Sequence, residues 1–136
     1  PVGSVLVGTR AFIHRAHRWR KMLGGGMRQA GILAEAGLYA IENNMKRLEE
    51  DHRRTRLLAE GIKDIHGLFV EMETVESNMV YVKTESSAHT WQQMLSKQGL
   101  LCFALNENTL RFVLHLHIDD DQVAEAVQRI SGISIP

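Results

Sequence analysis

The chain has 136 residues, of which 44% are hydrophobic and 24% are charged, and this composition excludes a mainly disordered protein. Its single cysteine, Cys102, excludes an intrachain disulfide framework. No apolar run approaches the roughly 20 residues that span a bilayer, so we expect no membrane partner. No signal-peptide pattern is visible, which favours an intracellular protein; we expect the cytoplasm, with the mitochondrion as the open alternative.

Charged residues are distributed unevenly along the chain, although 16 basic and 16 acidic side chains give a net charge of zero. Residues 1–28 contain six basic side chains and no acidic one, so they carry a charge of +6, and residues 29–136 carry −6. The excess of positive charge in residues 1–28 indicates that this segment binds an anionic ligand. A nucleic-acid partner is not expected, because Trp19 alone is available to stack on a base.

The first 43 residues predict one short strand and two helices. The apolar run at residues 3–8 is closed by glycines, which is typical of a buried strand, and Thr9 can cap the helix that follows. Apolar residues recur at helical spacing over residues 10–23. Residues 27–43 are apolar nearly all round and rich in Ala and Gly, which indicates a buried or interface helix. Since this set lacks a sheet neighbour, we expect residues 1–43 to be the end of a larger α/β domain.

Residues 44–136 predict a small α+β domain in which helices cover one side of an antiparallel or mixed sheet. The expected helices are residues 45–65, residues 88–98 and a segment that begins after residue 119; the expected strands are residues 68–73, 79–84, 101–105 and 109–117. Residues 106–108 suit a tight hairpin, and Asp119 with Gln122 forms a variant of the capping box. The fold class is therefore α/β, made of the end of one domain and a second, small α+β domain.

Arg111 is the first candidate for a functional side chain. Strand alternation over residues 109–117 gives one purely apolar face, which is expected to be core and includes Leu116, and Arg111 falls on the opposite face. A guanidinium offers a planar fork that suits a carboxylate or a phosphate. The alternatives are an arginine that pairs with a structural acid and an arginine on a sheet face in water, and the pattern leaves them open.

Three other groups of reactive or charged side chains favour structural interpretations. His115 and His117 are spaced as a metal pair, but no cysteine or acid at ligand spacing completes a site, so no metal is predicted. Cys102 falls in an apolar strand and is expected to be a small core residue. The arginines within residues 53–56 are either an anion patch or, as we favour, a solvated face offset by the acids at residues 49–51.

The strongest block of sequence is basic and glycine-rich and covers residues 18–29. Lys21 and Arg28 flank three consecutive glycines, which are Gly24, Gly25 and Gly26. Glycines let a backbone approach a ligand closely, and the N-terminus of the next helix offers N–H groups to an anion. The block predicts an anion-binding loop at or near an interface, and the alternative is a flexible turn between two helices.

Three motifs of the chain occur together, and in the same order, in one enzyme family. They are R-W-R-K-M-x-G-G-G-M-R-Q at residues 18–29, N-M-V at residues 78–80 and L-R-F-V-x-H at residues 110–115. On these motifs the chain resembles the low-specificity L-threonine aldolases over essentially its whole length. The resemblance implies a pyridoxal 5′-phosphate enzyme of the aspartate-aminotransferase-like fold (fold type I), usually a homotetramer. Such an enzyme cleaves L-threonine or L-allo-threonine to glycine and acetaldehyde.

The resemblance also implies roles for individual residues. Arg111 matches the family's arginine that binds the substrate carboxylate. Lys21 and Arg28 match residues that reach toward the cofactor near a subunit interface, with Arg28 a candidate for the phosphate, and the loop Gly24–Gly26 helps to complete the pocket.

The catalytic lysine of the family is expected upstream of Pro1. In the family this Schiff-base lysine lies in a Ser-Lys-Gly-x-Gly segment, just before a Pro-Val-Gly stretch that corresponds to residues 1–3 of this sequence. No lysine of the 136 residues lies in that context. The resemblance therefore implies no catalytic residue within this sequence and no activity of the chain alone.

We therefore interpret the chain as the C-terminal part of such an aldolase. Residues 1–43 are assigned to the end of the large cofactor-binding domain, and residues 44–136 to the small domain. The expected partners are a small amino-acid substrate and further copies of the protein. The alternative is a non-catalytic truncated remnant that serves oligomerisation or anion binding, and an upstream Ser-Lys-Gly segment would distinguish the enzyme from the remnant.

Overall fold

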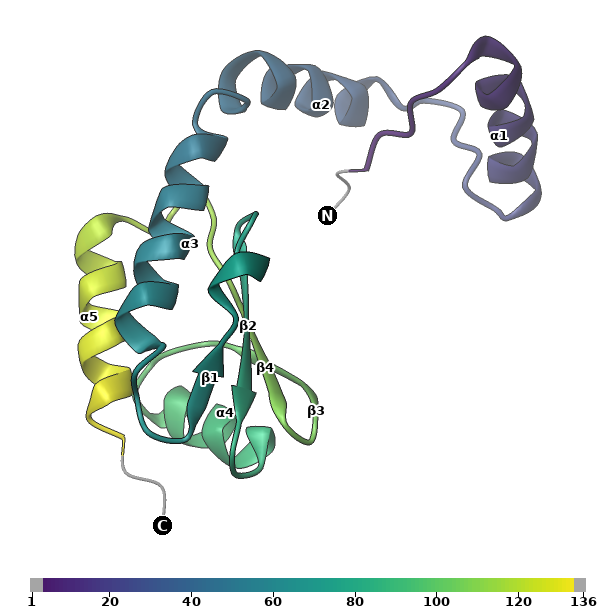
Figure 1. Ribbon diagram of the computed structural model, residues 1–136. Coiled ribbons are helices and arrows are strands. Elements are labelled where there is room, and N and C mark those ends of the chain that lie inside the picture. The colour runs from purple at the N-terminus through teal and green to yellow at the C-terminus, as the bar shows by residue number, and fades with distance from the viewer. Residues whose placement is uncertain (1–3, 134–136) are drawn as a thin grey trace. The chain divides into compact units, whose positions relative to one another are not determined.

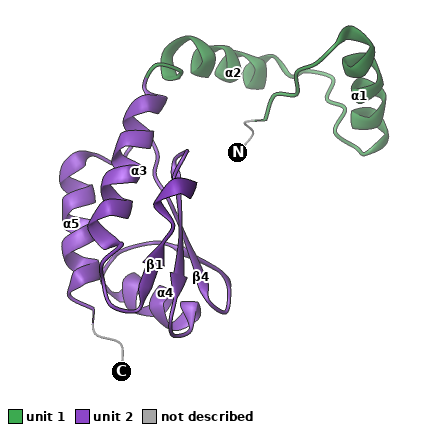
Figure 2. Cartoon of the chain, in the orientation of Figure 1, with its two compact units in different colours: residues 1–46 green, residues 47–136 purple. Residues whose placement is uncertain are grey.

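The computed structural model describes residues 4–133, which form five α-helices, one 3₁₀-helix and four β-strands (Figure 1). The chain divides into two compact units, residues 1–46 and residues 47–136 (Figure 2). The first unit contains two helices, and the second contains the sheet and three helices. Within residues 4–133, no helix is both long enough and apolar enough to cross a membrane.

Helix α1 (Arg10–Met22) begins where the sequence predicts and ends one residue earlier, with Leu23 as its C-cap. The Thr9 hydroxyl accepts a hydrogen bond from the backbone N–H of Phe12 (3.3 Å), so the predicted cap is confirmed. Gly24 lies just beyond the helix with φ of +82°, a left-handed conformation that glycine adopts without strain. The glycines therefore end α1 and lead into a loop, as predicted.

The strand predicted at residues 3–8 is wrong for the part that the structure describes. Residues 4–9 have no regular secondary structure, and Val5, Leu6 and Val7 are exposed. Backbone groups of a strand need a neighbouring strand for their hydrogen bonds, and the four described strands pair only with one another. Gly3, the first residue of the predicted strand, lies outside the described residues.

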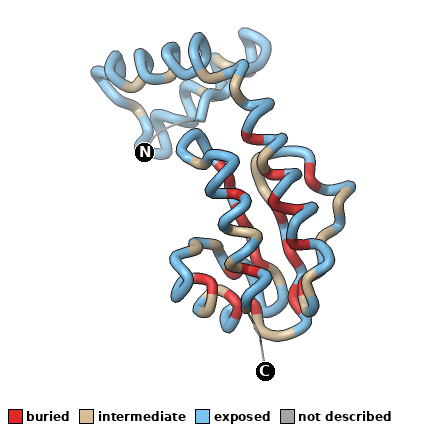
Figure 3. Tube along the Cα trace, turned by 90° about the vertical axis from the view of Figure 1, so that its left-hand side faces the viewer, coloured by how far each residue is buried: buried red, intermediate tan, exposed pale blue. Residues whose placement is uncertain are grey.

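Helix α2 (Gly31–Asn44) differs from its prediction in its start and in its burial. It begins four residues later than expected, after an Ala30 that provides no side-chain cap. None of its residues is buried, and the apolar side chains of Ile32, Tyr39 and Ile41 are exposed. Of the two predicted alternatives, a helix buried within this chain is therefore wrong, because residues 4–46 contain no buried residue (Figure 3), and an interface helix stays a prediction.

The second unit is built on a four-stranded antiparallel sheet in the order β1-β2-β4-β3. The strands are β1 (Leu68–Val70), β2 (Met79–Thr84), β3 (Phe103–Asn106) and β4 (Thr109–Val113). Strands β3 and β4 form the predicted hairpin, and a β-bulge interrupts their register between Ala104 and Asn106. The sheet with its helices confirms the expected small α+β domain.

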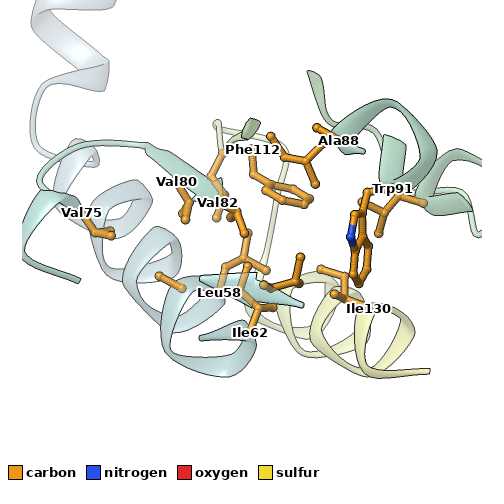
Figure 4. Close-up of a cluster of buried hydrophobic side chains, with 14 of the residues drawn as sticks. Leu58, Ile62, Val75, Val80, Val82, Ala88, Trp91, Phe112 and Ile130 are labelled. Atoms are coloured by element: carbon orange, nitrogen blue, oxygen red, sulfur yellow. The ribbon is translucent and has the colours of Figure 1, made fainter. Parts of the chain in front are cut away.

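Helices α3 (Leu48–Ile62), α4 (Ala88–Lys97) and α5 (Asp120–Ser131) pack with one face of this sheet around a single core (Figures 1 and 4). Every second strand residue points into that core, as the alternation of buried and exposed positions in β2 and β4 shows. The core includes the helix residues Leu58, Ile62, Trp91 and Ile130 and the strand residues Val80, Val82 and Phe112 (Figure 4). The other face of the sheet stays open to solvent.

Three strands are shorter than predicted, and one of them, β3, begins at Phe103 instead of residue 101. Strand β1 ends at Val70, and the rest of the expected segment is a 3₁₀-helix (Met72–Thr74). Strand β4 ends at Val113, after which the backbone N–H of Leu114 still donates to the carbonyl of Asn78 (2.9 Å). Leu116, however, lies in a turn and is 51% exposed. The prediction that Leu116 belongs to the core face is therefore wrong, because the pleat that would turn it inward stops before it.

The start of α5 follows its sequence pattern closely. Asp119 accepts a hydrogen bond from the backbone N–H of Gln122 (2.8 Å), and its own N–H donates to the Gln122 side chain (2.9 Å). This reciprocal pair is the predicted capping box, and it satisfies two backbone donors that a helix start leaves free. Helix α5 is thereby fixed at the end from which Val123 enters the core.

Cys102 lies just before β3 rather than within a strand, and it packs against the core as a partly buried residue. Burial raises the pKa of its thiol to about 11, because the charged thiolate loses its hydration in apolar surroundings. The thiolate is the nucleophilic form of cysteine. The expectation of a structural rather than nucleophilic cysteine therefore agrees with its surroundings.

Leu57 and Leu58 provide a matched test of the core. They are adjacent in α3, yet Leu58 is 4% exposed and Leu57 is 42% exposed. Leu58→Ala should lower the free energy of unfolding by about 2–5 kcal/mol, since it leaves a cavity, and Leu57→Ala by less than about 1 kcal/mol. Urea unfolding followed by the fluorescence of Trp91, in a Trp19→Phe background, measures both. Equal losses would contradict the core described here.

The reactivity of Cys102 should depend steeply on pH. A thiol with a pKa of about 11 instead of 9.0 contains roughly a hundredfold less thiolate at pH 8. A disulfide reagent such as DTNB should therefore react slowly with the folded chain at pH 8, and the rate should rise as the pH approaches 11. The same chain unfolded in urea is the control, and equal rates at pH 8 would refute the burial effect.

Candidate functional site

The open face of the sheet, by which we mean the strand face that no helix covers, carries the strongest candidate, Arg111. Arg111 lies in β4, an inner strand, directly opposite Tyr81 of β2 and Phe103 of β3. These three residues form one row across the face, with the arginine in the middle. The predicted placement of Arg111 on the face opposite the core is confirmed by the burial of its neighbours Leu110 and Phe112.

The guanidinium of Arg111 has no acidic partner within residues 4–133, since none of the ion pairs or side-chain hydrogen bonds there includes it. Its Cζ lies 5.8 Å from the centroid of the Phe103 ring. Its Nε is buried without a hydrogen bond, although the residue as a whole is only half-buried. The interpretation as an arginine held by a structural acid is therefore excluded for the described part of the chain.

Arg111 can bind an anion through its terminal nitrogens, which the buried Nε leaves as the accessible donors. A guanidinium that is not already neutralised by a carboxylate of its own chain retains its full charge for an incoming one. The neighbouring side chains Tyr81 and Phe103 are exposed and largely apolar, so the charge lies between two apolar surfaces. The arrangement suits a small molecule that carries a carboxylate beside an apolar part.

The glycine loop lies in the first unit and brings Lys21 over its backbone. A Cβ at residue 26 would lie 2.6 Å from Cδ of Lys21 and 3.5 Å from its Nζ, so Gly26 leaves the room that this side chain occupies. A Cβ at Gly25 would in the same way lie 3.1 Å from Cγ of Arg20. The loop therefore presents an ammonium group directly beside backbone that carries no side chain.

Arg28 follows the loop as an exposed side chain, and among the described residues it makes no ion pair. The sequence places the start of α2 next to the glycines, but it lies at Gly31, so its free N–H groups are separated from them by residues 27–30. The groups that remain are two cations beside a backbone that carries no side chains, and their charge fits an anion such as the phosphate of pyridoxal phosphate. The fit rests on Lys21, Arg28 and the loop Gly24–Gly26.

The lysine that would carry the cofactor is not among these residues. The resemblance places it upstream of Pro1, and Pro1 itself lies outside the residues that the structure describes. Lys21 is the lysine of the glycine loop, and its context, Arg-Trp-Arg-Lys, differs from the Ser-Lys-Gly-x-Gly of the family. The position of the Schiff-base lysine before Pro1 therefore stays a prediction.

The arginines of α3 are neutralised within the chain. Asp120 at the start of α5 accepts hydrogen bonds from Nε of Arg54 (2.6 Å) and from Arg53 (2.7 Å), and these bonds hold the pKa of Asp120 below its ordinary value. Arg56 pairs with Glu60 (3.3 Å). The solvated-face interpretation of this cluster therefore describes the structure better than an anion patch.

Two details of the surrounding charges differ from the sequence expectation. The pattern puts Asp51 on the solvated face, but it is buried and forms a bidentate pair with Arg47 at 2.8 and 2.9 Å. The pattern puts His115 and His117 on a strand, but they lie beyond β4 with their rings edge to face. The backbone N–H of His117 donates to Nδ1 of His115 (3.3 Å), and residues 4–133 contain no cluster of three metal-ligating side chains.

Phe103 is the residue of this site that the sequence did not reveal. A simple hairpin count from residues 106 and 109 places Ala104 opposite Arg111 and turns Phe103 toward the core. The bulge between Ala104 and Asn106 shifts this register by one residue and exposes Phe103 on the open face instead. The cation–aromatic pair of Arg111 and Phe103 could therefore be identified only once the position of the bulge was known.

Comparison with known proteins gives one family match. Residues 1–85 match the family described as beta-eliminating lyase, a stretch that includes the glycine loop and ends with β2. The match covers more than half of the chain, and it extends over both compact units.

Individual relatives carry the similarity further along the chain. The low specificity L-threonine aldolase of Escherichia coli K12 is 43% identical over 126 residues, which is 92% of this chain and 36% of the relative. Low-specificity L-threonine aldolase 1 of Arabidopsis thaliana is 39% identical over 90% of this chain and 36% of its own length. Aldolase vrtJ of Penicillium aethiopicum is 35% identical over 99% of this chain and 33% of its own. The chain thus spans about a third of the length of the curated relatives it matches.

Proposed function

We propose, because this chain belongs to the beta-eliminating lyase family, that it forms the C-terminal part of a pyridoxal-phosphate-dependent aldolase. Three relatives named as aldolases, two of them as L-threonine aldolases, match at least 90% of the chain, and a stretch of that length within 136 residues includes Arg111. The proposed reaction is cleavage of L-threonine or L-allo-threonine to glycine and acetaldehyde.

We assign residues 1–43 to the end of the large cofactor-binding domain and residues 44–136 to the small domain. The burial pattern supports this assignment, since the second unit has a core of its own and residues 4–46 have none. A segment that buries nothing internally is stable when it packs against other surfaces. The proposed surfaces are the rest of the large domain and further copies in a homotetramer.

Arg111 is proposed to bind the substrate carboxylate, and its freedom from any acid in the described chain is the observation that carries this proposal. The terminal nitrogens donate two parallel hydrogen bonds to the carboxylate oxygens. This contact fixes one end of the amino acid and leaves its Cα and side chain to be placed by the rest of the pocket. The role of Arg111 is thus binding and orientation, not proton transfer.

Lys21, Arg28 and the loop Gly24–Gly26 are proposed to hold the phosphate of the cofactor. Pyridoxal 5′-phosphate supplies, when bound, an electron sink for cleavage of the Cα–Cβ bond. The ammonium of Lys21 and the guanidinium of Arg28 offset the charge of the phosphate. The N–H groups of Gly24 and Gly25 already donate to the carbonyls of Lys21 and Arg20, so the loop contributes a backbone without side chains rather than a set of free donors. None of these residues is proposed to react.

A second candidate function is a non-catalytic module for oligomerisation or anion binding. The exposed apolar side chains of α2 favour it, because Ile32 is 89% exposed and Tyr39 is 62% exposed. Such a surface is typical of a helix that packs against another chain. The aldolase and the non-catalytic module differ in one feature. The aldolase requires a Schiff-base lysine for the cofactor elsewhere in the protein, and the module does not.

The 136-residue chain by itself should form no specific adduct with pyridoxal phosphate, because none of its lysines lies in the Ser-Lys-Gly-x-Gly context of the family. Borohydride reduction followed by peptide mass spectrometry measures this directly. The E. coli relative, treated in parallel, should give one reduced lysine. Stoichiometric modification of one lysine of the chain would overturn the expectation.

The role of Arg111 can be measured in a chimaera in which this chain replaces the matching third of the E. coli relative. Arg111→Ala should raise the KM for L-threonine by roughly ten- to a hundredfold, since a charge-assisted contact contributes roughly 1.5–3 kcal/mol. Arg56→Ala, an exposed arginine of the same unit, is the matched control and should leave KM unchanged. An unchanged KM in Arg111→Ala would contradict carboxylate binding.

A further inference from the structure

The aromatic ring of Phe103 lies against the guanidinium of Arg111. Packing in the hydrophobic core does not explain this position of the ring. The ring is 58% exposed, so little of its surface contributes to the core. Cζ of Arg111 lies over the ring at 5.8 Å from its centroid, within the range of about 6 Å at which the face of an aromatic ring attracts a cation. The contact is therefore better explained by the arginine than by packing.

The backbone holds Phe103 in this place from both sides. On the inner side, residue 103 pairs with Arg111 across the antiparallel ladder. On the outer side, the backbone N–H of the next residue, Ala104, donates to Oε1 of Gln92 in α4 (2.9 Å), and Ala104 itself is buried. Because the neighbouring residue is fixed inward, strand alternation fixes the Phe103 ring on the open face.

The guanidinium beside this ring lacks the contacts that usually orient an arginine. It pairs with no acid among residues 4–133, and its Nε is buried without a hydrogen-bond partner. A long side chain loses rotamer freedom when it binds a ligand, and this loss weakens binding unless the side chain is held beforehand. The Phe103 ring is in cation–aromatic contact with the guanidinium and can hold it.

We propose that Phe103 is a positioning residue for Arg111. Its ring holds the guanidinium against the open face with the terminal nitrogens directed outward, so that a carboxylate meets a donor pair that is already oriented. The inference rests on the proposed carboxylate role of Arg111. It adds a residue of β3 that sets the affinity for the amino acid without touching the reacting atoms.

The first test uses the 136-residue chain itself. Hydrogen exchange of the Arg111 Nε–H, followed by ¹⁵N NMR, should be roughly two- to fivefold faster in Phe103→Leu, because the cation–aromatic attraction that holds it is lost. Phe103→Tyr keeps the ring and should restore the slow rate. Phe69→Leu is the matched control, since Phe69 is 56% exposed on the same face, in β1, and should leave the rate unchanged. Equal rates in Phe103→Leu and Phe69→Leu would overturn the positioning role.

The second test uses the chimaera with the E. coli relative. Phe103→Leu should raise the KM for L-threonine roughly two- to fivefold and leave kcat unchanged, and Phe103→Tyr should restore KM. If Arg111→Ala raises KM but Phe103→Leu behaves as Phe69→Leu, the positioning role is wrong and the carboxylate role stands. If Arg111→Ala leaves KM unchanged, the carboxylate role itself is wrong, whatever the exchange rates show.

Discussion

The antiparallel pairing of β4 with β2 on one side and β3 on the other decides the face of the sheet on which each strand residue lies. Helices cover one face only, so alternate residues of β4 are either core or accessible. Leu110 and Phe112 point into the core, and strand alternation therefore places the side chain of Arg111 on the open face. The burial of its neighbours thus determines the position of the charged side chain, and the proposed substrate contact depends on hydrophobic packing beneath it.

The face on which each residue of β4 lies can be predicted from the sequence. Apolar residues that recur at every second position indicate a strand that is buried on one side. The position of Arg111, the capping box of α5 and the order of elements in the second unit all follow from such local patterns. The contact of Arg111 with Phe103 does not follow from a local pattern. The bulge in β3 changes the pairing by one residue without altering the apolar pattern of the strand, so the contact with Phe103 becomes visible only in three dimensions.

In the first unit, unlike the second, the apolar pattern of the sequence does not correspond to burial in the structure. Residues 4–8 and α2 have the apolar content of buried elements, and none of them is buried in this chain. An apolar pattern predicts that a surface is covered without identifying what covers it. Helix α1 and its cap are predictable because they need only local hydrogen bonds, whereas a strand needs a neighbour. The glycine loop is likewise local, whereas the position of the Lys21 side chain over Gly26 is visible only in the structure.

The hydrogen bond from Ala104 to Gln92 has a consequence for the protein in a crowded solution. Strand β3 is an edge of the sheet, and the segment around it exposes the apolar side chains of Leu101 and Phe103. An edge of that kind, with free backbone donors, can add a strand from a neighbouring molecule and start aggregation. The amide of Gln92 occupies the outward N–H of Ala104, so the edge offers an incoming strand one backbone donor fewer at its centre. The same side chain that secures Phe103 therefore also makes strand addition at this edge less favourable.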